Sequence, residues 1–227
     1  MSKAFTIRKA ALVATLAGSL VLLSACNNDS DKGANATIAP ATTVAGAVDA
    51  TQPASGSDAT ELVTTAIAAL GPDYHFATTV KVGDAVVLAV QGDRVGGGAR
   101  LSLSSDAGVV NYLIVGADSW AKPENGVWAQ LEAAPSNTDP MVALAQASAA
   151  KVVSVEGGTT TVELTVMNAD LGIGAEGTAT VTVQITDGRL VFAVYGTTLE
   201  NQPALVSTEF GAVVDATPVT APTETGA

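Results

Sequence analysis

Residues 178–190 read TATVTVQITDGRL, and this stretch decides the class of fold. Apolar side chains occupy every second position up to residue 185, which is the period of a strand with one buried and one polar face. Asp187-Gly188 then supplies a dipeptide typical of a two-residue hairpin turn. The stretch therefore predicts an antiparallel hairpin, 178–186 with 189–199, in a sheet with one solvated face.

The same period of two recurs on both sides of this hairpin. Apolar and polar residues alternate from Tyr74 to Val82, and a nearly continuous apolar run spans 109–115. The further strands that we predict are 85–90, 99–105, 119–122, 127–131, 151–156, 159–167 and 204–210. A chain with this many one-sided strands is expected to form a largely antiparallel sheet whose apolar face must be covered.

Only two segments of the sequence are expected to form helices that could cover the apolar face of the sheet. Asp58 is placed as an N-cap with Glu61 at capping-box spacing, and Gly71-Pro72 ends that helix after residue 70. Asp139-Pro140 starts the second helix, which we expect to continue to about Ala150. The prediction is one α+β domain over residues 58–216.

Composition excludes several functions. The 227 residues carry 22 acidic against 10 basic side chains, a net charge of −12, which argues against nucleic-acid binding. One Cys and one His allow neither an intramolecular disulfide nor a zinc site of the Cys/His type. We therefore expect no metal and no cofactor.

The first 25 residues have the pattern of an export signal. Lys3, Arg8 and Lys9 precede an uncharged stretch, 10–23, that is shorter than the roughly 20 apolar residues a membrane-spanning helix needs. Leu23-Ser24-Ala25-Cys26 resembles the bacterial lipobox, in which the Cys receives diacylglycerol and becomes residue one. The alternative is a chance Cys after an ordinary signal peptide. Without the signal, 22 acidic and 7 basic residues give a charge of −15.

Lipidation at Cys26 would attach the protein to the extracytoplasmic side of the cell membrane. Residues 26–57 are rich in Ala, Thr, Gly and Pro and are expected to form a disordered tether. A Thr- and Pro-rich tail, 217–227, is expected to be disordered as well.

Local motifs, in their order along the chain, resemble a known family. They are Tyr74-His75-Phe76, Trp120-Ala121-Lys122 with Gly126-Val127-Trp128, Thr138-Asp139-Pro140, Ile185–Leu190, and Phe210-Gly211 followed by Ala221-Pro222. Together with the lipobox they resemble the LppX/LprG-type lipoproteins, actinobacterial relatives of the lipoprotein carrier LolA. The resemblance implies a half-barrel sheet with short helices over its concave face and an apolar cavity for lipid acyl chains.

An inward-facing set of side chains would line that cavity. We predict it to comprise Tyr74, Phe76, Val80, Val82, Leu88, Val90, Leu101, Leu103, Tyr112, Ile114, Val181, Val183, Ile185, Leu190 and Phe192. The same residues would equally form a filled core, and Trp120 and Trp128 would suit either a ligand mouth or core packing.

The sequence leaves three functions open. The first is a non-enzymatic, monomeric lipoprotein that binds or carries lipids or acylated molecules; the sequence names no protein partner. The second is a surface interaction or sensor lipoprotein with a filled core. The third, a hydrolase using His75, is disfavoured because no Gly-x-Ser-x-Gly motif is present and His75 is expected on the polar face.

Overall fold

The structure, a computed structural model, describes residues 57–133, 139–174 and 176–223. The predicted signal, the lipobox with Cys26 and nearly all of the tether lie outside the described residues. The helices are α1 (Ser57–Leu70) and α2 (Pro140–Ala145). The strands are β1 (Tyr74–Val82), β2 (Ala85–Val95), β3 (Gly98–Ser105), β4 (Gly108–Val115), β5 (Asp118–Pro123), β6 (Ala129–Gln130), β7 (Ala149–Glu156), β8 (Thr159–Met167), β9 (Thr178–Thr186), β10 (Arg189–Leu199) and β11 (Gln202–Gly211).

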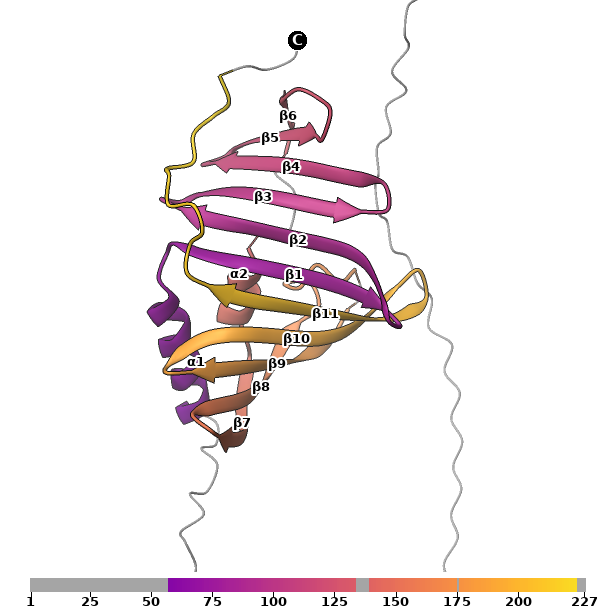
Figure 1. Cartoon of the computed structure of the whole chain (residues 1–227). Helices are drawn as coiled ribbons and strands as arrows, with labels where there is room; N and C mark the ends of the chain where they lie inside the picture. The colour runs from indigo at the N-terminus through magenta and orange to yellow at the C-terminus, as the bar shows by residue number, and fades with distance from the viewer. Residues whose placement is uncertain (1–56, 134–138, 175, 224–227) are drawn as a thin grey trace, which may run out of the picture. The chain divides into compact units, whose positions relative to one another are not determined.

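All eleven strands belong to one curved antiparallel sheet (Figure 1). Their order is β6-β5-β4-β3-β2-β1-β11-β10-β9-β8-β7, so the first and last strands of the chain pair in the middle. Every hydrogen-bonded pair except β1 with β11 joins strands that are consecutive in the sequence. The predicted α+β class with a largely antiparallel sheet is confirmed.

Tight turns follow the predicted chemistry. Asp187 and Gly188 have φ of 51° and 74°, the positive values that a two-residue hairpin of this kind requires. Gly96 and Gly97 form the equivalent turn between β2 and β3, with φ of 60° and 81°. Glycine adopts positive φ without steric cost, which explains its use in these turns.

Both helices cover the same face of the sheet, which we call the inner face. α1 buries Ala59, Val63 and Ala66 in the core cluster, to which Met141 and Leu144 of α2 also belong. α2 is shorter than predicted, because β7 begins at residue 149. Among the described residues, no helix has both the length and the apolar character needed to cross a membrane.

One face assignment from the sequence is wrong. A β-bulge lies between Leu190 and Phe192 in the pairing of β10 with β9. Leu190 is buried on the inner face, but Phe192 is paired with the exposed Gln184 and therefore lies on the opposite, outer face. The added residue shifts the alternation by one, so Ala193 takes the inward position instead.

Two strand ends also differ from the prediction. β2 continues to Val95 instead of ending at residue 90, and β6 contains only residues 129–130 of the predicted 127–131. Gly92, Asp93 and Arg94 interrupt the apolar alternation of β2, although their backbones continue its pairing with β1 and β3.

The sequence predicts a disordered tail over residues 217–227, of which 224–227 lie outside the described residues; the described C-terminal segment is 212–223. In the structure it leaves β11 and passes the ends of β1, β2 and β3 (Figure 1). Several contacts with the sheet fix its course, and two of them involve residues 217 and 219. Thr217 accepts a hydrogen bond from Arg100 through its backbone oxygen, and the side chain of Val219 lies against Gly98.

Candidate functional site

A cavity of about 190 Å³ lies between the inner face and α2. Most of its lining is apolar and comes from both halves of the sheet. The sheet contributes Phe76, Thr78, Val90, Leu101, Leu103, Tyr112, Val181, Ala193, Tyr195, Val206 and Thr208. The cover contributes Asp139, Pro140, Ala143 and Leu144 from α2 and its cap, and Asp170 and Leu171 from the connection between β8 and β9.

Short side chains at facing positions explain why this part of the core is not filled. Ala143 of α2 and Ala193 of β10 both line the cavity, where longer side chains would occupy it. Thr78 and Thr208 are cross-strand partners, and their hydroxyl oxygens lie 2.9 Å apart. One hydroxyl donates to the other, so each of these two polar groups has a protein partner at the edge of the cavity.

The predicted inward set divides into four groups. Phe76, Val90, Leu101, Leu103, Tyr112 and Val181 line the cavity. Tyr74, Ile114, Val183, Ile185 and Leu190 belong to or pack against the filled core cluster. Val80, Val82 and Leu88 share the inner face through their cross-strand partners but lie outside the cavity. Phe192 is on the outer face.

The sequence missed the rest of the lining. Ala193, Tyr195 and Val206 are on the inner face and line the cavity. The alternation of β10 places Ala193 and Tyr195 there once the extra residue of the bulge is included. The connection between β8 and β9 has no period that would place Asp170 and Leu171 at the cavity.

A single carboxylate holds α2 over the sheet. Asp139 is the N-cap of α2 and accepts a hydrogen bond from the backbone N–H of Met141 at 3.0 Å. Its Oδ1 also accepts from the hydroxyl of Tyr74, and its Oδ2 lies 3.2 Å from Nε of Arg94. Burial and the adjacent carboxylate raise the pKa of Tyr74 well above its usual value, so this hydroxyl stays a donor.

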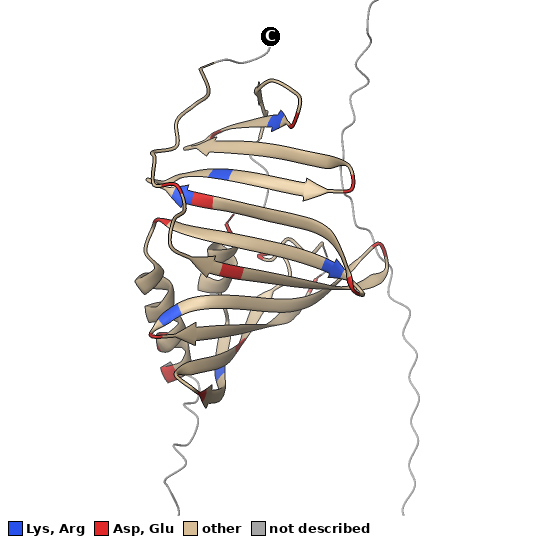
Figure 2. Ribbon diagram, in the orientation of Figure 1, with Lys and Arg blue, Asp and Glu red and all other residues tan. Residues whose placement is uncertain are grey.

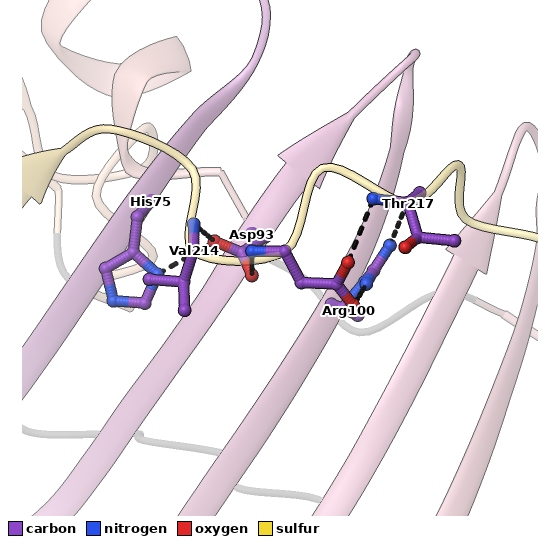
Figure 3. Close-up of polar contacts among 6 residues, drawn as sticks. His75, Asp93, Arg100, Val214 and Thr217 are labelled. Carbon is purple, nitrogen blue, oxygen red and sulfur yellow. Dashed lines mark hydrogen bonds and ion pairs between the residues drawn. The ribbon is translucent and has the colours of Figure 1, made fainter.

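On the outer face, Asp93 receives the C-terminal segment (Figure 3). Its Oδ1 accepts from the backbone N–H of Val214 at 3.0 Å and lies 2.9 Å from Nδ1 of His75. Its Oδ2 accepts from the N–H of Asp215 at 3.3 Å. Burial alone would raise the pKa of Asp93, but these hydrogen bonds together hold it below its usual value.

Further contacts, next along the chain, also attach the C-terminal segment to the sheet. Asp215 pairs with Arg100, and the backbone N–H of Thr217 donates to Asp215 at 2.9 Å. The bonds from Thr217 and the nearby Arg100 lower the pKa of Asp215. His75 is therefore part of the attachment of the C-terminal segment and lies on the face opposite the cavity.

The two tryptophans also lie away from the cavity. Trp120 is opposite Leu113 in the pairing of β4 with β5, and Leu113 lines an outer groove with Trp128 and residues 220–223. Lys122 Nζ is 5.9 Å from the centre of the Trp128 ring, within the range of a cation–π contact. Neither Trp forms a mouth to the inner cavity.

Within residues 57–133, 139–174 and 176–223, no group of three or more His, Cys, Asp or Glu side chains is arranged to hold a metal ion.

Solved structures that resemble this chain include one mycobacterial protein. No protein-family model and no curated protein matches the chain. The crystal structure of LprF from Mycobacterium bovis is similar over 76% of this chain and 100% of that chain, with 16% sequence identity and a TM-score of 0.49.

Proposed function

We propose that this chain is a non-enzymatic, membrane-anchored lipoprotein that binds an acyl chain between the sheet and α2. The observation that carries the proposal is the apolar cavity, which α2 and the connection between β8 and β9 cover. Binding would bury methylene groups against Phe76, Leu103 and Val181, which stabilises the complex by about 0.8 kcal/mol per CH₂.

The size of the cavity limits the ligand. About 190 Å³ exceeds the roughly 150 Å³ that accommodates benzene in an engineered apolar cavity. It is smaller than the roughly 300–1,000 Å³ of sites that enclose drug-sized molecules. We therefore propose that one alkyl chain enters the cavity, while the remainder of a larger lipid stays outside.

Anchoring is proposed from the sequence around Cys26. A diacylated Cys would bind a membrane stably, whereas a surface of net charge −15 offers little attraction to anionic lipids. The full chain should fractionate with membranes, and Cys26→Ser should release it without altering the folded domain. Continued membrane binding by Cys26→Ser would overturn the lipidation proposal.

Binding is tested with decanol, a neutral alkyl probe, in an NMR titration of methyl groups. We expect the methyl signals of Val181 and Ala193 to shift. Ala143→Met should place a longer side chain in the cavity and weaken binding at least tenfold. Val142→Met is the matched control, because Val142 is on the same helix and 52% exposed.

Two results would overturn the lipid-binding proposal. One is the absence of any decanol-induced shift on the inner face, together with purified protein that contains no lipid by mass spectrometry. The other is equal weakening by Ala143→Met and Val142→Met, since only the first of these positions lines the cavity.

A second candidate is an interaction lipoprotein, favoured by the outer groove. Leu113, Trp128 and residues 220–223 line that groove, which has a volume of about 420 Å³. A stoichiometric protein partner whose binding is lost in Trp128→Ala but kept in Ala143→Met would favour this role over lipid binding.

A further inference from the structure

The charges around the inner cavity are unbalanced. Two acidic residues, Asp139 and Asp170, line it, and none of its described lining residues is Lys or Arg. Across the described sheet, most acidic residues lie in the connections, whereas the Lys and Arg residues lie on the strands (Figure 2). Asp139 and Asp170 also lie in connections, and what distinguishes them is that both line an apolar cavity.

Asp139 is already matched. Arg94 supplies the opposite charge at 3.2 Å, and Tyr74 and the backbone N–H of Met141 donate hydrogen bonds to the same carboxylate. These contacts occupy both of its oxygens with protein groups. Asp139 consequently adds little net charge to the cavity and holds α2 in place.

Asp170 differs, because its carboxylate makes no hydrogen bond or ion pair with any described residue. Its backbone is held by a turn, in which its N–H and that of Leu171 donate to the oxygen of Met167 at 3.1 and 3.3 Å. The residue is half-buried. The fold thus fixes the position of Asp170 at the lining and leaves its carboxylate without a protein partner.

Nearby neutral groups can donate but cannot balance a second negative charge. Thr78 and Thr208 bond to each other, whereas no partner is described for the hydroxyls of Tyr112 and Tyr195. A ligand carboxylate or phosphate would lose water next to Asp170 without meeting a cation. A hydroxyl or ammonium group would instead donate a charge-assisted hydrogen bond to Asp170.

We propose that the cavity selects amphiphiles whose polar end is uncharged or cationic and donates hydrogen bonds, and that Asp170 sets this selectivity. The inference rests on the proposed function, since it concerns the ligand of the same cavity. It excludes free fatty-acid anions as the preferred ligand and favours acyl chains carried on alcohol, polyol or amine head groups.

The test compares decanol, decylamine and decanoate, which share one alkyl chain and differ in charge at pH 7. We expect decanol and decylamine to bind at least tenfold more tightly than decanoate in isothermal titration. Asp170→Asn should reduce the difference between decylamine and decanoate to less than threefold. Asp187→Asn removes the same charge from the exposed β9–β10 turn and should leave the difference unchanged.

A second variant keeps the test decisive if Asp170→Asn alters the turn. Asp170→Lys should reverse the order, so that decanoate binds more tightly than decylamine. If none of the probes binds, the proposed function fails and the selectivity with it. If all three bind the wild type equally, or decanoate binds best, acyl binding stands and the role of Asp170 is wrong.

Discussion

Arg94 and Asp139 form an ion pair, 3.2 Å between Nε and Oδ2, that joins strand β2 to the N-cap of α2. Tyr74 is the cross-strand partner of Arg94, and its hydroxyl donates to the same carboxylate. Residues of two neighbouring strands, β1 and β2, therefore contact the N-cap of the helix that covers the cavity. Asp139 thus links the cover to both strands, in addition to the packing of Met141 and Leu144 in the core.

Replacing Asp139 by Ala should destabilise the domain by about 1–3 kcal/mol, because the cap is lost and Tyr74 and Arg94 are left without their acceptor. Urea denaturation measures the change. Asp106→Ala, in the exposed β3–β4 turn, is the control and should change stability by less than about 0.5 kcal/mol. A similar loss in both variants would contradict the role assigned to Asp139.

Asp93 should make stability depend on pH. Its pKa in the folded protein lies below the ordinary 3.8, so its ionised form is favoured by folding. That stabilisation is complete well above 3.8 and is lost as the pH falls through 3.8 toward the folded pKa. The difference in unfolding free energy between wild type and Asp93→Asn should therefore shrink from pH 7 to pH 3.

Hydrogen exchange gives an independent reading of the same attachment. The amide protons of Val214 and Asp215 should exchange faster in Asp93→Asn than in the wild type at pH 7. The amide of Phe210, within β11, should be unaffected. Unchanged protection at Val214 would show that Asp93 does not hold the C-terminal segment.

Gly98 should be needed for the course of that segment. A Cβ at this position would lie 2.8 Å from Cβ of Val219 and 3.0 Å from the backbone oxygen of Ile114. Gly98→Ala should displace residues near 219 and make them more sensitive to limited proteolysis. Gly196→Ala is the control, because a Cβ there meets nothing within 4 Å, and its proteolysis pattern should match the wild type.

The bulge in β10 predicts different costs for two neighbouring side chains. Leu190 is 1% exposed, so Leu190→Ala should destabilise the domain by about 2–5 kcal/mol. Phe192→Ala should cost less than half as much, because Phe192 lies on the outer face. Equal losses of unfolding free energy in the two variants, measured by chemical denaturation, would contradict the bulge and support the unbroken alternation that the sequence predicts.

Strands were predictable where alternation and turn chemistry agree. Thr178–Thr186 and Arg189–Leu199 were predicted with the observed bounds, since both patterns point to the same hairpin around Asp187-Gly188. Beyond residue 90 of β2 the apolar alternation stops. Asp93 and Arg94 contact segments that are far away in the sequence, which local patterns cannot show.

The cavity was only partly predictable for the same reason. Alternation identifies which side chains share a face, and it found Phe76, Leu103 and Val181. Alternation does not distinguish an empty region of the core from a filled one. That difference depends on which side chains of α2 and β10 line the same space, here Ala143 and Ala193. The composition of residues 217–223 is typical of disorder, and only Arg100 and Gly98 in the sheet give them a defined course.

Pairing of β1 with β11 has a consequence for the order of folding. Strands β1–β6 and β7–β11 each form a series of local hairpins, whereas His75 and Gly211 meet only after nearly the whole domain is available. Such distant pairings are the slow step in sheet formation. Because Phe76 and Val181 belong to different halves, the lining of the cavity is complete only once β1 and β11 have paired.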